Sequence, residues 1–135
     1  MNDAAILNGK KVLIVEDNQL NLLIAKRCLD SFGMIYSIAT DGQSAITLLG
    51  QENFDVVLLD LNIPVLDGWE IASFIRSSAE KNQNTPIIVV SASEDPNLEN
   101  KLKASKINAA IYKPYTPEQL KKALIENFVP VSSSI

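Results

Sequence analysis

The chain has 135 residues, of which 47% are hydrophobic and 21% are charged, so it is long enough for one globular domain with its own core. Its formal net charge of −4 disfavours direct nucleic acid binding, which requires a clustered basic surface. The chain contains no histidine and a single cysteine, Cys28. These absences exclude histidine-based triads, histidine-ligated zinc, a self-phosphorylating histidine and an internal disulfide.

Two further absences concern location. No apolar run approaches the roughly 20 residues that span a bilayer. Residues 1–5 lack the basic start and the long apolar core of a signal peptide. We therefore expect a cytoplasmic protein that makes no membrane contact through this chain.

Five short apolar runs predict five strands, over residues 11–15, 35–39, 56–59, 87–90 and 109–112. The first, third and fourth are unbroken aliphatic runs, which are typical of parallel strands buried on both faces. The second and fifth are weaker, because Ser37 interrupts one and alanine makes up half of the other. We expect these two at the edges of the sheet.

Amphipathic stretches between the runs predict five helices, over residues 18–32, 41–52, 67–79, 95–105 and 117–128. Asp41 is expected to cap the second helix, Pro96 to lie near the first turn of the fourth, and Thr116 with Gln119 to form a capping box on the fifth. The fourth helix is the least apolar.

The alternation of strand and helix predicts an α/β fold of the flavodoxin-like (βα)5 type. Its parallel five-stranded sheet should have the order 2-1-3-4-5, with helices on both faces. We expect a single domain over residues 10–128, an N-terminal tail over 1–9 and a C-terminal tail over 129–135.

Reactive side chains follow the strands at one edge of this sheet. Glu16 and Asp17 follow the first strand, Asp60 the third, Ser91 the fourth and Lys113 the fifth. Sites in open parallel sheets form beyond the carboxyl ends of the strands, so these groups should share one rim. Three crowded carboxylates need a cation, and oxygen ligands favour Mg²⁺. Asp60 is best placed as the nucleophile of a phosphoryl transfer, because it ends the most central strand.

Four fragments at these strand ends resemble the motifs of response-regulator receiver domains. They are Val15-Glu16-Asp17-Asn18, the run from Leu59 to Pro64 with Asp67-Gly68, Ser91-Ala92, and Lys113-Pro114. The resemblance covers nearly all of residues 10–128. It implies that Asp60 accepts a phosphoryl group from a partner's phosphohistidine.

The resemblance also implies a role for each residue of the site. Asp17 and Asp60 would ligate Mg²⁺ together with the backbone carbonyl of Asn62, and Glu16 would hold the metal through water. Ser91 and the backbone N–H of Ala92 would bind phosphoryl oxygens. Lys113 would pair with the phosphoryl group, and the Lys113-Pro114 peptide would be cis.

Partners and output are likewise implied by the resemblance. The phosphodonor would be a sensor histidine kinase or a histidine-phosphotransfer domain that docks near the first helix. Phosphorylation would change the surface of the fourth helix, fifth strand and fifth helix, in a monomer or a weak phosphorylation-dependent dimer. One departure is Ala110, where the family usually carries a tyrosine or phenylalanine that acts as a switch.

Several alternatives remain open. The sequence from Glu16 to Asn18, followed by Asn21, is closer to receivers of hybrid kinases, but a stand-alone regulator also fits. We expect self-phosphorylation from a small phosphodonor and autodephosphorylation, without turnover of a free substrate. Competing functions are a Mg²⁺-dependent phosphohydrolase with an aspartate nucleophile and a binding module that acts without phosphorylation. A flavin-binding module is disfavoured, because Glu16 and Asp17 would repel a phosphate.

Overall fold

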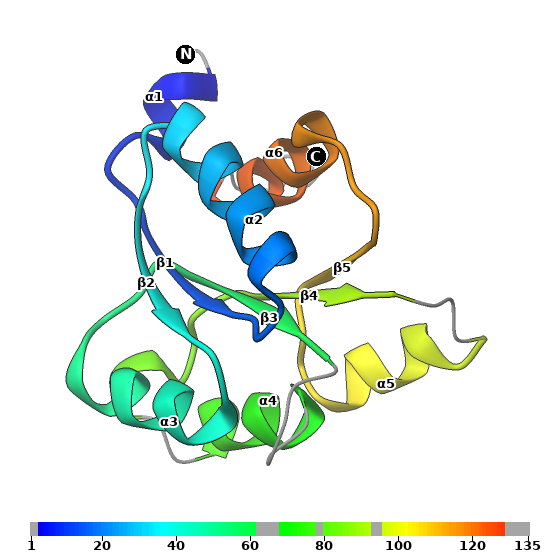
Figure 1. The fold of residues 1–135 in the computed structure, drawn as a ribbon. Coiled ribbons are helices and arrows are strands. Elements are labelled where there is room, and N and C mark those ends of the chain that lie inside the picture. The colour runs from blue at the N-terminus through cyan, green and yellow to red at the C-terminus, as the bar shows by residue number, and fades with distance from the viewer. Residues whose placement is uncertain (1–2, 62–67, 78–79, 93–95, 129–135) are drawn as a thin grey trace, which may run out of the picture.

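The sheet topology follows the predicted order. The structure is a computed structural model that describes residues 3–61, 68–77, 80–92 and 96–128. Five parallel strands are arranged in the order β2-β1-β3-β4-β5 (Figure 1). They are β1 (Lys11–Val15), β2 (Ile35–Ala39), β3 (Val56–Asp60), β4 (Ile87–Ser91) and β5 (Ala109–Tyr112). The third and fourth strands each extend one residue beyond their predicted ends, so Asp60 and Ser91 belong to the sheet itself.

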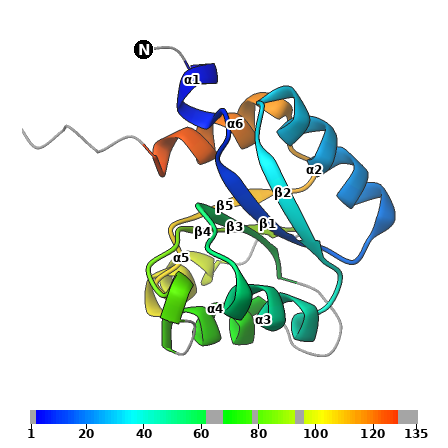
Figure 2. The same cartoon turned by 90° about the vertical axis from the view of Figure 1, so that its left-hand side faces the viewer.

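Helices cover both faces of the sheet (Figures 1 and 2). One face carries α1 (Asp3–Leu7), α2 (Gln19–Ser31) and α6 (Pro117–Glu126). The other face carries α3 (Gly42–Gln51), α4 (Gly68–Ser77) and α5 (Leu98–Ala104), and a short 3₁₀ helix, η1 (Glu80–Asn82), precedes β4. Successive residues of the inner strands enter the two core layers alternately, as Val57 and Leu58 do in β3. These strands are therefore buried on both sides, as their unbroken aliphatic runs predict.

The N-terminal residues differ from the predicted tail over 1–9. Residues 3–7 form α1, and Leu7 is fully buried in the same core layer as Leu120 and Leu124 of α6. A segment of only five residues gives a weak helix signal, and this helix is held by tertiary packing. The predicted C-terminal tail over 129–135 lies outside the described residues.

The helix caps largely follow the sequence. The Asp41 side chain accepts a hydrogen bond from the Ser44 N–H at 2.7 Å, and Thr116 and Gln119 form the predicted capping box. The fourth predicted helix is shorter than expected, because α5 begins at Leu98 and Pro96 lies in the preceding turn. Leu98 is the one buried side chain among the residues of α5, which agrees with its low apolar content.

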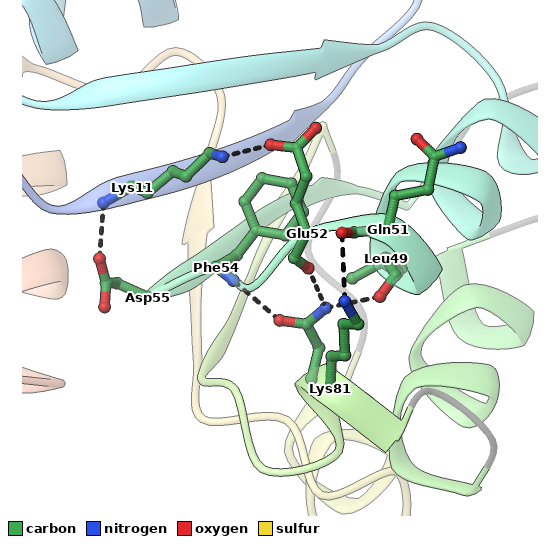
Figure 3. A network of polar contacts seen from close by, with 8 residues as sticks. Lys11, Leu49, Gln51, Glu52, Phe54, Asp55 and Lys81 are labelled. Atoms are coloured by element: carbon green, nitrogen blue, oxygen red, sulfur yellow. Dashed lines mark hydrogen bonds and ion pairs between the residues drawn. The ribbon is translucent and has the colours of Figure 1, made fainter.

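A buried asparagine joins three segments where α3 ends and β3 begins, the region in which Figure 3 labels Leu49, Glu52 and Phe54. The Asn82 side chain is fully buried, and its Oδ1 accepts a hydrogen bond from the Phe54 N–H at 2.9 Å. Its Nδ2 donates to the carbonyls of Leu49 at 2.7 Å and Glu52 at 2.8 Å. Asn82 therefore fixes the end of α3 and the start of β3 relative to η1.

A second polar contact ties α4 to the loop that follows α5. The Arg76 guanidinium donates to the carbonyls of Lys106 at 3.0 Å and Thr85 at 2.8 Å, and to the Asn108 side chain at 3.1 Å. Lys106 has a φ of 56°, in the left-handed region that costs a residue with a Cβ about 1 kcal/mol or more. Arg76 thus holds the turn after α5 through the Lys106 carbonyl, while Lys106 itself has a strained backbone.

Replacing Lys106 by glycine should stabilise the domain, because glycine adopts a positive φ without the Cβ clash. We expect Lys106→Gly to raise the free energy of unfolding by about 1 kcal/mol and the Tm by roughly 3–5 °C. Lys103→Gly is the matched control, because Lys103 lies within α5, where glycine lowers stability. Thermal unfolding followed by circular dichroism would test this, and an unchanged or lower Tm for Lys106→Gly would contradict it.

Candidate functional site

Three carboxylates meet at the carboxyl ends of β1 and β3. Glu16 and Asp17 directly follow β1, and Asp60 is the last residue of β3. Each offers an oxygen within 4.8 Å of the other two. Glu16 is 6% exposed and Asp60 is 4% exposed, whereas Asp17 is exposed to solvent. Two of the three acids are therefore largely desolvated.

Lys113 completes the group from the end of β5. Its Nζ lies 2.9 Å from Oδ2 of Asp60 and 3.4 Å from Oε1 of Glu16. Its backbone N–H donates to the Ser91 carbonyl at 2.8 Å, and the Lys113-Pro114 peptide is cis. Burial alone would lower the pKa of Lys113, but the hydrogen bond and charge of Asp60, with those of Glu16, raise it overall. Lys113 therefore stays an ammonium ion facing the acids.

The electrostatics of the acids favour a further cation. Burial, and then the hydrogen bond with Asp60, raise the pKa of Glu16 to about 7. The backbone N–H of Asn18, which donates to Oε2 of Glu16 at 3.1 Å, acts in the opposite direction. Lys113 alone therefore does not offset the burial of Glu16 and its contact with Asp60. Closely spaced carboxylate oxygens of this kind fit a hard cation such as Mg²⁺.

The other predicted site residues lie around this group. Ser91, at the end of β4, is 6% exposed, and Ala92 next to it is exposed. Asn62 lies outside the described residues. Ala110 packs against the core layer shared with α4, and Tyr112 is paired in register with Ser91 across β4 and β5 and is 41% exposed.

A mainly apolar cavity of about 260 Å³ adjoins the charged group. Its polar lining includes Glu16, Asp60 and Lys113, and its apolar lining includes Ile24 of α2 and Tyr115. The sequence-based prediction did not single out Ile24 or Tyr115. In the sequence, the one feature that could have indicated Ile24 is an isoleucine on the outward face of an amphipathic helix. In the structure its side chain is 41% exposed.

Comparisons with known proteins agree with this geometry. The response regulator receiver domain family matches residues 12–125. Sensor histidine kinase AruS of Pseudomonas aeruginosa is 33% identical over 124 residues, which cover 91% of this chain and 12% of that protein. The chain thus spans only about an eighth of the length of this curated relative.

Two solved structures are similar over most of the chain. The receiver domain of sensor histidine kinase PA1611 from Pseudomonas aeruginosa, with a magnesium ion coordinated in its active site cleft, gives a TM-score of 0.81 at 30% identity. The alignment covers 89% of this chain and 98% of that one. The chemotaxis protein CheY4 of Vibrio cholerae gives 0.82 at 28% identity, over 90% of this chain and 99% of that one.

The fold and the acidic rim are those of a doubly wound signalling domain. The chain belongs to the response regulator receiver domain family, whose members act in two-component and phosphorelay signal transduction. Among the residues that the structure describes, no helix combines the length and apolar composition needed to cross a bilayer.

Proposed function

We propose that Asp60 is the phosphoacceptor of this receiver domain. The observation that carries the proposal is the position of its buried carboxylate, 2.9 Å from the Lys113 ammonium and within 4.8 Å of two further acids. One Asp60 oxygen attacks phosphorus, the P–O bond forms as the P–N bond of the donor phosphohistidine breaks, and the imidazole leaves with a proton. Transfer of this kind depends mainly on positioning and on charge stabilisation.

The same residues are suited to hold Mg²⁺. Asp17 and Asp60 would be direct ligands with the carbonyl of Asn62, and Glu16 would act through water. The fit is supported by the donor chemistry, since all the side-chain ligands are carboxylates and two of them are buried. When bound, the metal neutralises charge on the phosphoryl oxygens.

Ser91, Ala92 and Lys113 would bind the phosphoryl group itself. Lys113 already faces Asp60, and its backbone bond to Ser91 links the ends of β4 and β5. A phosphoryl group adds about −1.5 to −2 charges at this rim, which would draw in the Ser91 hydroxyl and the Ala92 N–H. The affected surface would comprise α5, β5 and α6. Ala110 carries no ring, so the usual aromatic switch of the family cannot operate at that position.

The proposed phosphodonor is a sensor histidine kinase or a histidine-phosphotransfer domain that docks on α2. Three apolar side chains of this helix lie open to solvent: Leu20 is 64% exposed, Leu23 is 42% and Ile24 is 41%. Ile24 also lines the cavity beside Asp60. A partner on this surface could bury apolar area while it delivers its histidine to the rim. We also propose that the protein is cytoplasmic.

Incubation with acetyl phosphate and Mg²⁺, followed by intact-mass measurement, tests this function. We expect the mass of one phosphoryl group to be gained in Mg²⁺, and little or no gain after the metal is removed with a chelator, because the rim then carries uncompensated negative charge. Slow loss of the added mass would report autodephosphorylation. No gain at any Mg²⁺ concentration would favour a binding module, and continuous release of phosphate from simple phosphate esters would favour a phosphohydrolase.

A further inference from the structure

Asn18, the residue after the two acids, is held by contacts on three sides. Its side-chain Oδ1 accepts a hydrogen bond from the Asn21 N–H at 2.9 Å, which caps the N-terminus of α2. Its carbonyl accepts from the Leu22 N–H at 2.9 Å, the first backbone bond of that helix. Its own N–H donates to Oε2 of Glu16 at 3.1 Å.

These contacts determine where the backbone points. Asn18 has φ −83° and ψ 123°, the extended conformation of an N-cap residue. The cap bond maintains this conformation, in which the N–H is directed back toward the carboxylate of Glu16. The peptide between Asp17 and Asn18 is fixed by the same contacts.

Glu16 is therefore held at both oxygens. Oε2 accepts from the Asn18 N–H at 3.1 Å, and Oε1 lies 3.4 Å from the Lys113 ammonium. The lysine ammonium also contacts Asp60, whereas the backbone N–H of Asn18 donates to Glu16. Loss of the Asn18 contact would leave the Glu16 side chain held only from the side of Asp60 and Lys113.

We propose that Asn18 is a positioning residue for the metal site, which it serves through its helix cap. The cap aims the Asn18 N–H at Glu16 and fixes the peptide that carries Asp17, so that both acids are oriented before a cation binds. This inference rests on the proposed function, because it assigns Glu16 and Asp17 to a Mg²⁺ site. Groups that orient metal ligands in this way typically change metal affinity by about 10–100-fold when they are removed.

Two neutral variants separate the cap from other properties of the side chain. Asn18→Ser retains a hydroxyl oxygen that can accept from the Asn21 N–H, whereas Asn18→Ala has no acceptor. We expect the Mg²⁺ dissociation constant, measured from the rise in Tm with Mg²⁺ concentration, to increase about tenfold in Asn18→Ala. Asn18→Ser should stay close to the unmodified protein.

A second helix of the chain provides the matched control. Asp41 caps α3 through a bond of 2.7 Å from the Ser44 N–H. Asp41→Asn and Asp41→Ala both remove the charge, but only Asp41→Asn keeps a capping oxygen. We expect this pair to differ in Tm without Mg²⁺, as the pair at position 18 does, but to share one Mg²⁺ dissociation constant. Equal dissociation constants for Asn18→Ala and Asn18→Ser would overturn the inference, as would a similar difference at position 41.

A metal-free measurement keeps the inference independent of the proposed metal site. In the nuclear magnetic resonance spectrum of the metal-free protein, the backbone amide of residue 18 should show slow hydrogen exchange in the unmodified chain and in Asn18→Ser. In Asn18→Ala this protection should be lost, because the N–H no longer faces Glu16. Unchanged protection would overturn the positioning role, whereas failure of the unmodified protein to bind Mg²⁺ would overturn the proposed metal site instead.

Discussion

Asp60→Asn is expected to abolish phosphoryl acceptance. The amide oxygen of asparagine is a poor nucleophile, and the substitution also removes a proposed metal ligand and the charge that faces Lys113. We expect a loss of roughly a thousandfold or more in the rate of phosphorylation by acetyl phosphate, so that no mass gain is detected. The fold should be retained, because asparagine has nearly the same shape as the buried aspartate.

The same substitution at the other end of β3 is the control. Asp55 directly precedes the strand and accepts a hydrogen bond from the Lys11 N–H at 2.7 Å, which an asparagine oxygen can also accept. Asp55→Asn should therefore show the full mass gain of the unmodified protein. Phosphorylation of Asp60→Asn at the normal rate would show that another residue is the acceptor.

Asn82→Ala should cause the largest loss of stability among the substitutions considered. It would leave the Phe54 N–H and the carbonyls of Leu49 and Glu52 without the partners they have now, in a region where Asn82 is fully buried. A buried polar group left unsatisfied costs about 1–3 kcal/mol, so we expect the free energy of unfolding to fall by about 3–4 kcal/mol. Urea unfolding, with a lower midpoint at a similar slope, would measure this loss.

Asn84 offers a control two residues away. It is exposed, and exposed polar substitutions usually change stability by less than about 0.5 kcal/mol. Asn84→Ala should therefore unfold at nearly the same urea concentration as the unmodified protein. If Asn82→Ala lost less than about 1 kcal/mol, water or a rearranged loop would have to satisfy the freed groups.

Most of the fold could be predicted from apolar patterning. The three unbroken aliphatic runs identified the inner strands, because only a strand covered on both faces tolerates such a composition. The weaker runs, at Ile35–Ala39 and Ala109–Tyr112, are indeed the edges of the sheet. Strand ends were predicted one residue short at Asp60 and Ser91, because a polar residue normally marks the end of an apolar run.

Two polar contacts that the sequence did not indicate depend on tertiary structure. Asn82 and Asn84 look alike in the sequence, and only the path of the chain around η1 makes one buried and the other exposed. Arg76 reaches a loop that lies 30 residues further along the chain at Lys106. Neither contact has a local signature, so no window of sequence could have indicated it.

The residues of the candidate site were easier to predict from the sequence than these two contacts. In a parallel sheet of known order, residues that follow neighbouring strands must come together, and Glu16, Asp60 and Lys113 do so. The backbone N–H of Asn18 was not foreseen, because a main-chain donor is the same in every residue and its direction depends on the helix cap.

The N-terminal helix bears on how the domain is delimited. The family match begins at residue 12, yet Leu7 of α1 is fully buried against α6. A fragment trimmed to the match would lose this side chain and leave part of the apolar surface of Leu120 and Leu124 to water. We therefore expect a fragment that retains residues 3–11 to be more stable than one trimmed to the family match, because it keeps Leu7 packed in this core layer.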